Sequence, residues 1–151
     1  AYTVLANKGE RMNLRIVDQI VDTETGDVYK YPVRSVGQVI KNKWAVKQII
    51  DMMKLATKQG GTAWRGSIPN YEVAGKTGTA QKWINGAYSH SKHFASFIGF
   101  VPADNPAFVL LVVVDEPKGS CYGGVVAGPA FRNISLKTLR YFDIPETMPT
   151  E

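Results

Sequence analysis

Residues 73–80 read Val-Ala-Gly-Lys-Thr-Gly-Thr-Ala, and this stretch decides which fold the rest of the sequence is compatible with. The Gly-Lys-Thr triplet at 75–77 resembles the end of a phosphate-binding P-loop, but that motif needs a glycine where the chain has Asn70. A P-loop also runs from a strand into a helix, whereas the next regular element expected here is a second strand. We therefore interpret residues 71–81 as a strand that contains glycines.

The residues of this strand fit a substrate that carries a carboxylate. Side chains two positions apart on a strand share a face, so Thr77 and Thr79 can both hydrogen-bond such a group. Lys76 supplies a cation beside a nucleophile, and Gly78 lets a substrate backbone lie close. The N–H of Thr79 can form half of an oxyanion hole. These are features of the Lys-Thr-Gly element in serine enzymes that react with β-lactams, although four residues alone also fit a glycine-kinked strand without a role.

The remaining pattern predicts an α+β fold, in which helices flank an antiparallel sheet. Hydrophobic periodicity, caps and turn residues predict these elements: the end of a helix at 1–7, strands at 14–21 and 28–31, a helix at 43–58 capped by Asn42, strands at 94–101 and 107–115, a helix at 125–142, and a frayed tail at 144–151. The short link between the last two strands makes them a hairpin. The apolar run at 109–114 predicts a central strand covered on both faces.

Composition and charge limit the classes of function. The chain has 151 residues, 44% of them hydrophobic, which fits one domain with a core. Its net charge of +5 comes from scattered lysines and arginines, which disfavours nucleic acid as a partner. The single Cys121 excludes an internal disulfide and a cysteine-rich zinc site. His90 and His93 have no acidic or cysteine partner at ligand spacing, so we predict neither a metal nor a cofactor.

Several segments, taken together, resemble class B penicillin-binding proteins, above all their septal, division-specific branch. They are Gly-Gly-Thr-Ala at 60–63, Tyr-Glu-Val-Ala-Gly-Lys-Thr-Gly-Thr-Ala at 71–80, Phe-Ile-Gly-Phe-Val-Pro-Ala at 97–103, Asp-Glu-Pro at 115–117 and Tyr-Gly-Gly-Val-Val-Ala-Gly-Pro-Ala-Phe at 122–131. The resemblance covers about residues 1–145. Cys121 departs from it, because many members carry a second tyrosine before Tyr-Gly-Gly.

The resemblance implies that residues 1–151 are the C-terminal part of a penicillin-binding transpeptidase domain, with a β-lactamase/transpeptidase-like fold. Members of the family need a serine with a lysine three residues on, a Ser-x-Asn loop and the Lys-Thr-Gly strand. The chain contains no Ser-x-Asn. Its one Ser-x-x-Lys, from Ser89 to Lys92, follows the Lys-Thr-Gly strand instead of preceding it, in an expected polar loop at 85–90 with no helix to orient the serine. We therefore expect the isolated chain to be inactive and the upstream part of the same domain to supply the serine.

For the intact protein, the resemblance implies a serine D,D-transpeptidase that cross-links peptidoglycan stem peptides in septal wall synthesis and is acylated by β-lactams. It implies Lys76 and Thr79 as catalytic residues, and Thr77, Gly78, Thr79 and Tyr122 as substrate-binding residues, without a metal or cofactor. Expected partners are peptidoglycan, a membrane glycosyltransferase and other division-complex membrane proteins. The expected location is the periplasmic side of the bacterial cell membrane, with an upstream anchor.

Two alternatives remain open from the sequence. A β-lactamase or D,D-carboxypeptidase of the same fold uses the same strand, although the segments at 60–63 and 122–124 argue against both. A non-catalytic penicillin-binding-like module would keep the strand and lack the nucleophile. The gene upstream of Ala1 separates these cases, since Ser-x-x-Lys and Ser-x-Asn codons there indicate an enzyme and a start codon indicates a module.

Overall fold

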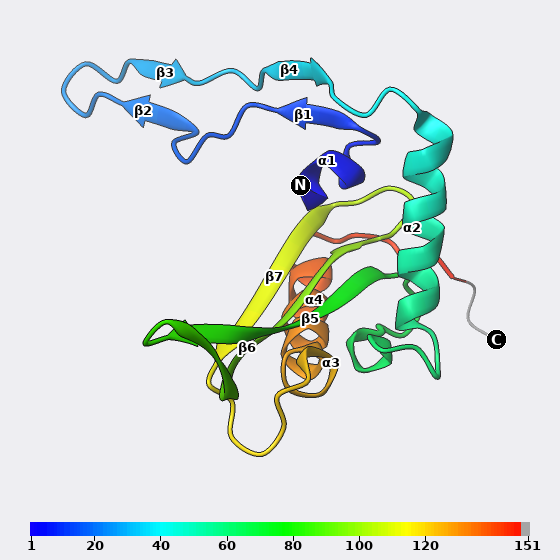
Figure 1. Cartoon of the computed structure of the whole chain (residues 1–151). Coiled ribbons are helices and arrows are strands. Elements are labelled where there is room, and N and C mark those ends of the chain that lie inside the picture. The colour runs from blue at the N-terminus through cyan, green and yellow to red at the C-terminus, as the bar shows by residue number, and fades with distance from the viewer. Residues whose placement is uncertain (149–151) are drawn as a thin grey trace.

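The centre of the structure is a three-stranded antiparallel sheet with helices packed on it (Figure 1). The computed structural model describes residues 1–148. In chain order the elements are α1 (Tyr2–Ala6), β1 (Glu10–Met12), β2 (Gln19–Val21), β3 (Val28–Lys30), β4 (Ser35–Gln38), α2 (Lys43–Thr57), the 3₁₀ turn η1 (Trp64–Gly66), β5 (Ala74–Ile84), β6 (Ala87–Val101), β7 (Phe108–Asp115), α3 (Gly123–Val126) and α4 (Gly128–Tyr141). This architecture confirms the predicted α+β class.

One face of the central sheet is covered by α4. Phe97 and Val101 of β6 are fully buried in the same core cluster as Phe131 and Leu139 of α4. The ring centroids of Phe97 and Phe131 lie 4.5 Å apart. Burying one such side chain contributes about 1.5–3 kcal/mol, so this layer is a major part of what holds α4 on the sheet.

The opposite face of the sheet is covered only in part. Phe100 and Ala74 pack there with Met53 of α2, but Leu111 and Val113 of β7 are 55% and 52% exposed. Within residues 1–148, β7 is an edge strand and β6 holds the central position. The prediction of a central strand covered on both faces is therefore wrong for β7. An apolar run shows that a strand can be buried, but it does not show which elements bury it.

The predicted start of α2 agrees with the structure, whereas the predicted start of the last helix does not. The side chain of Asn42 caps α2 as predicted, accepting hydrogen bonds of 3.1 Å from the N–H groups of Trp44 and Ala45. The helix predicted at 125–142 is confirmed from Gly128 to Tyr141, but it does not extend back to residue 125, because α3 and α4 are separate helices that meet at Ala127. Pro129 lies in the first turn of α4, where its missing N–H has no intrahelical partner to lose. No helix in the described part of the chain has the length and apolar character needed to span a membrane.

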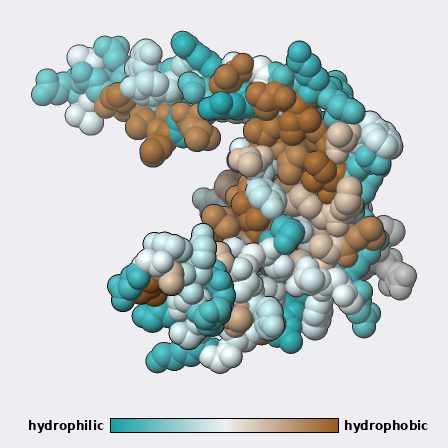
Figure 2. Space-filling model, viewed as in Figure 1, coloured by the Kyte–Doolittle hydropathy of each residue, from teal (hydrophilic) through white to brown (hydrophobic). Residues whose placement is uncertain are grey.

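Residues 10–38 form an arm that projects from the rest of the molecule (Figure 1). The arm consists of two antiparallel ladders, β1 with β4 and β2 with β3. Hydrophobic side chains gather on the side of the arm that faces the body (Figure 2), and Leu14 and Ile16 are 87% and 103% exposed. An apolar surface of this extent is typical of a segment that another part of a protein covers.

Strand β2 is shorter than predicted, because residues 14–17 loop out of the ladder. The N–H of Asn13 donates to the carbonyl oxygen of Arg34 at 2.8 Å, on one side of the loop. The N–H of Tyr31 donates to the carbonyl oxygen of Asp18 at 2.9 Å, on the other side. The sequence pattern also misses β1 and β4, which have three and four residues, too few for a clear alternation.

The hairpin of β5 and β6 is longer than predicted. Its strands continue to the two-residue turn Asn85–Gly86, whose φ angles of 51° and 84° are both positive, as a type I′ turn requires. The prediction of a polar loop at 85–90 is therefore wrong, since residues 87–90 lie in β6. The hairpin also starts later than predicted, at Ala74, after a turn at Asn70 with a φ of 63°.

The C-terminal segment that we predicted to be frayed is hydrogen-bonded up to residue 148. The hydroxyl of Tyr71 donates to the carbonyl oxygen of Ile144 at 2.6 Å. The N–H groups of Thr147 and Met148 both donate to the carbonyl oxygen of Asn70 at 3.0 Å. The prediction is wrong for residues 144–148, and its last three residues lie outside the described part of the chain.

Candidate active site

Lys76 lies on the free edge of the central sheet. Its strand, β5, pairs only with β6 among the described strands. The Lys76 side chain is exposed, and its Nζ lies 2.5 Å from the carbonyl oxygen of Thr77. No ion pair within residues 1–148 involves Lys76. A cation that no protein carboxylate neutralises attracts an anionic group to this edge.

The two threonines of the motif share the face of the sheet that α4 covers. Thr77 pairs with Phe97 and Thr79 with Ala95, and both partners are fully buried on that face. Thr77 is half-buried and Thr79 is exposed. Because side chains alternate along a strand, Lys76 lies on the opposite face. Two hydroxyls on one face and a cation on the other thus flank the same strip of backbone.

Gly78 has a packing reason to lack a side chain, in addition to the proposed approach of a substrate. A Cβ atom at this position would lie 2.5 Å from Oγ of Ser96, its partner on β6. The sequence indicates only the external reason, since the partner of Gly78 is not visible in it. The contact with Ser96 alone therefore favours glycine at this position.

The Tyr-Gly-Gly segment holds Tyr122 beside this strand. A Cβ at Gly123 would lie 2.5 Å from the carbonyl oxygen of Gly78, and a Cβ at Gly124 would lie 2.2 Å from that of Thr62. The two glycines therefore let the start of α3 rest directly on the sheet and on the segment at 60–63. Tyr122 precedes them and is 67% exposed. The structure thus brings Tyr122, Gly78 and the segment at 60–63 together, an arrangement that sequence order does not reveal.

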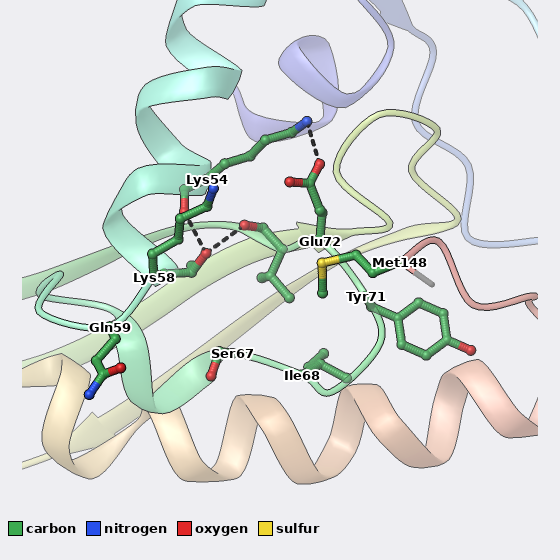
Figure 3. Close-up of a pocket in the computed structure, with 10 residues that line it drawn as sticks. Lys54, Lys58, Gln59, Ser67, Ile68, Tyr71, Glu72 and Met148 are labelled. Atoms are coloured by element: carbon green, nitrogen blue, oxygen red, sulfur yellow. Dashed lines mark hydrogen bonds and ion pairs between the residues drawn. The ribbon is translucent and has the colours of Figure 1, made fainter. Parts of the chain in front are cut away.

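A cavity of about 210 Å³ lies at the start of β5, away from Lys76 (Figure 3). Nζ of Lys54 lies 2.7 Å from carboxylate oxygens of both Glu72 and Asp104. Burial alone would lower the pKa of Lys54, but the hydrogen bonds to Asp104 and Glu72 outweigh it and raise that pKa. The same hydrogen bond lowers the pKa of Asp104. Both shifts favour the charged forms of Lys54 and Asp104, so this ion pair helps to position the start of β5.

The other candidates from the sequence do not form a second site. Oγ of Ser89 accepts hydrogen bonds from the N–H groups of Ser91 and Lys92 at 3.3 and 3.0 Å, within β6 and not at a helix start. Among residues 1–148, no cluster of three or more His, Cys, Asp or Glu side chains could hold a metal ion, and His90, His93 and Cys121 belong to none.

Residues 1–136 match the family model described as the penicillin binding protein transpeptidase domain. The chain belongs to this family. A curated relative of this transpeptidase chain is the probable peptidoglycan D,D-transpeptidase PenA of Neisseria gonorrhoeae, 37% identical over 150 residues, which are 99% of this chain and 24% of the relative. The chain thus spans about a quarter of the length of that protein.

Solved transpeptidase structures have the same fold. The apo transpeptidase domain of Burkholderia pseudomallei penicillin-binding protein 3 superposes with a TM-score of 0.77 at 34% identity, covering 98% of this chain and 42% of that one. Penicillin-binding protein 3 of Mycobacterium tuberculosis, solved with ampicillin, gives a TM-score of 0.83 at 28% identity, covering 99% of this chain and 34% of that one. These likenesses confirm the family and the fold inferred from the motif segments taken together.

Proposed function

We propose that this chain supplies the Lys-Thr-Gly edge of a serine D,D-transpeptidase active site that cross-links peptidoglycan. One observation carries the proposal: Lys76 is exposed and free of ion pairs within residues 1–148, on a strand edge that also bears Thr77, Gly78 and Thr79. This arrangement fits a peptide that ends in a carboxylate and lies extended along β5. The match to proteins named as transpeptidases supports the same reaction.

The proposed reaction has two acyl-transfer steps. A serine from residues outside this sequence attacks the carbonyl carbon of the penultimate D-alanine, and the terminal D-alanine leaves with the proton that the serine lost. The amine of a neighbouring stem peptide then attacks the ester carbonyl carbon, the C–O bond to the serine breaks, and the serine oxygen leaves with the proton that the amine loses. During both steps the N–H of Thr79 stabilises the oxyanion. Thr77 and Thr79, on one face of β5, hydrogen-bond the substrate carboxylate, and the Lys76 cation helps to attract it. Tyr122 contacts the substrate from the start of α3.

The same proposal gives the partners and the location of the intact protein. Peptidoglycan and β-lactams bind at the β5 edge, and the solved relative with bound ampicillin supports the second of these. The wall polymer lies outside the cytoplasm, so the domain acts there. We extend the proposal to an anchor outside this sequence, to a periplasmic location and to division-complex partners, on the resemblance to the septal branch. The remaining part of the domain covers the open face of the sheet.

Acylation of the full-length native protein by a fluorescent penicillin tests this function. Lys76→Met should lower the second-order acylation rate by roughly ten- to a hundredfold, the effect of losing one charge-assisted bond of about 1.5–3 kcal/mol. Lys137→Met is the matched control, because Lys137 is an exposed lysine on α4. Equal rates for the two variants, or no acylation of the native protein, would contradict the proposal.

A further inference from the structure

Two exposed aromatic side chains lie at the tip of the β5–β6 hairpin. Trp83 and Tyr88 pair across the strands, with ring centroids 4.9 Å apart and planes at 77°. Each is 63% exposed. Tryptophan and tyrosine that are paired and left in water are typical of recognition surfaces, where they carry much of the binding energy. The reaction proposed above does not use either ring.

Ion pairs link the base of the hairpin to the end of β7, at the point where the register of β5 on β6 shifts. Nζ of Lys82 lies 2.8 Å from Asp115 and 2.9 Å from Glu116, and 4.7 Å from the centre of the Phe94 ring. Lys92 lies 3.4 Å from the same Glu116. The charges near the hairpin therefore neutralise one another, and the tip does not present a free cation or anion from these groups.

What the tip does present is two aromatic rings beside neutral polar groups. Asn85 occupies the turn, and Ser89 follows Tyr88 on β6. Sugar rings have apolar C–H faces that stack on aromatic rings, and hydroxyl and acetamido groups that form hydrogen bonds. Tryptophan and tyrosine match this mixture, because each has an apolar ring and one polar group. A neutral amino sugar fits the tip better than a charged ligand does.

The reach of a stem peptide brings its sugar to the same place, provided that the proposed function holds. If Thr77 and Thr79 bind the substrate carboxylate and the N–H of Thr79 binds the reacting carbonyl, a stem that continues along β5 away from Lys76 runs toward Trp83. The four residues from Thr79 to Trp83 cover at most about 13 Å, because the register of β5 on β6 shifts between Gln81 and Trp83. A stem of roughly four extended residues spans at most about 14 Å. A fully extended stem therefore has the length needed to bring its sugar to the hairpin tip.

We propose that Trp83 and Tyr88 form a binding site for the glycan backbone of peptidoglycan, an N-acetylated amino-sugar disaccharide. Two other exposed aromatic pairs have similar geometry, Tyr29 with Tyr31 on the arm and Tyr141 with Phe142 at the end of α4. Neither lies on the strand that carries Lys76. The pair of Tyr141 and Phe142 is therefore a matched control.

Competition with fluorescent penicillin in the full-length native protein tests the site. One probe is the pentapeptide stem alone, and the other is the same stem on its N-acetylglucosamine–N-acetylmuramic acid disaccharide. In the native protein and in Tyr141→Leu/Phe142→Leu, the sugar should tighten competition about tenfold. In Trp83→Leu/Tyr88→Leu this ratio should fall to about one. An unchanged ratio, a native ratio of one, or equal weakening of both probes would overturn the glycan site.

Saturation-transfer NMR with the disaccharide alone is a second test of sugar binding that requires no acylation and no variant. Irradiating the aromatic protons of the native protein should saturate the sugar ring protons, and the stem peptide alone should not prevent this. Acylation without such transfer would count against the glycan site only. Transfer without acylation would count against the proposed function only.

Discussion

The hydroxyl of Thr57, in the last turn of α2, donates a hydrogen bond of 2.7 Å to the carbonyl oxygen of Val73, one residue before β5 begins. Thr57 and Val73 are 5% and 3% exposed. The Thr57 hydroxyl also contacts the carbonyl oxygen of Lys54 at 2.8 Å. The end of a helix thus fixes the start of the strand that carries Lys76.

Thr57→Val should destabilise the full-length protein by about 1–3 kcal/mol. The change keeps the shape of the side chain but leaves the buried carbonyl oxygen of Val73 without its donor. Thermal and urea unfolding measure the loss. Thr138→Val is the control, because its hydroxyl bonds to Ile134 on the exposed side of α4. Equal losses for both variants would show that the bond to Val73 has no special weight.

The ion pairs that Lys54 forms with Glu72 and Asp104 should stabilise the fold only within a limited range of pH. The lowered pKa of Asp104 contributes stability that is present above the ordinary carboxyl pKa of about 4 and is lost as the pH falls. The raised pKa of Lys54 contributes stability that is present below the ordinary lysine pKa of about 10 and is lost as the pH rises. Lys54→Met should therefore cost about 1 kcal/mol between these limits, since Asp104 is 74% exposed and solvent weakens its share.

Urea unfolding of the native protein and of Lys54→Met, from pH 3 to pH 11, tests this window. The difference in unfolding free energy between the native protein and Lys54→Met should become smaller toward pH 3 and toward pH 11. Lys47→Met removes an exposed pair with Asp51 and should cost no more than about 0.5 kcal/mol. A difference between native protein and Lys54→Met that is constant with pH would contradict the window.

Two substitutions at Thr79 distinguish the role of its side chain from that of its backbone N–H. In the full-length protein, Thr79→Ala keeps the N–H and should remain a measurable penicillin binder. Thr79→Pro removes the N–H, and the loss of one oxyanion donor lowers the acylation rate by about a hundred- to a thousandfold. Circular dichroism must first show that the proline variant is folded. Equal acylation rates for the two variants would place the oxyanion hole elsewhere on β5.

The isolated 151-residue chain should form no covalent adduct with penicillin. Its only Ser-x-x-Lys match has the serine in β6, bonded to its own backbone neighbours. Denaturing electrophoresis after incubation with a fluorescent penicillin makes the measurement. A labelled band that disappears in Ser89→Ala would reverse the prediction and make Ser89 a nucleophile.

The isolated chain should also self-associate through the open face of its sheet. Leu111 and Val113 expose half of their surface there, and apolar patches of this kind drive association in water. Light scattering should show species larger than a monomer, and Leu111→Thr/Val113→Thr should reduce them. Ile134→Thr on the exposed side of α4 is the control, since Ile134 is 45% exposed. A native chain that stays monomeric at high concentration would contradict this expectation.

The sequence predicted elements where short-range patterns dominate. Asn42 predicted the start of α2, and the residues at 71–81 predicted the strand that carries the Lys-Thr-Gly motif. The prediction of a loop at the hairpin tip is wrong, although Asn85–Gly86 is a strong signal for a type I′ turn. The polar residues around that turn suggest a loop, yet Ile84 pairs with Ala87 and Trp83 with Tyr88 before the register shifts.

Other features depend on contacts that no local pattern contains. The position of β7 at an edge depends on which elements cover it, and the break at Ala127 depends on how α3 rests on the sheet. For the site, Lys76 to Thr79 and Tyr122 were found by their motifs, and their roles stay predictions. The contact of Gly124 with Thr62 brings together the segments at 60–63 and 122–131, which lie far apart in the sequence.

The hydrogen bonds of the C-terminal segment have a consequence for the order of folding. Tyr71 bonds to Ile144, 73 residues later, and the N–H of Glu72 donates to Oγ1 of Thr147, 75 residues later. Closing loops of that length is entropically costly and slow compared with forming a helix or a hairpin. On a ribosome, the segment that leads into the Lys-Thr-Gly strand cannot complete these bonds until α4 and the residues after it have emerged. The strand entrance is therefore among the last parts of this chain to mature.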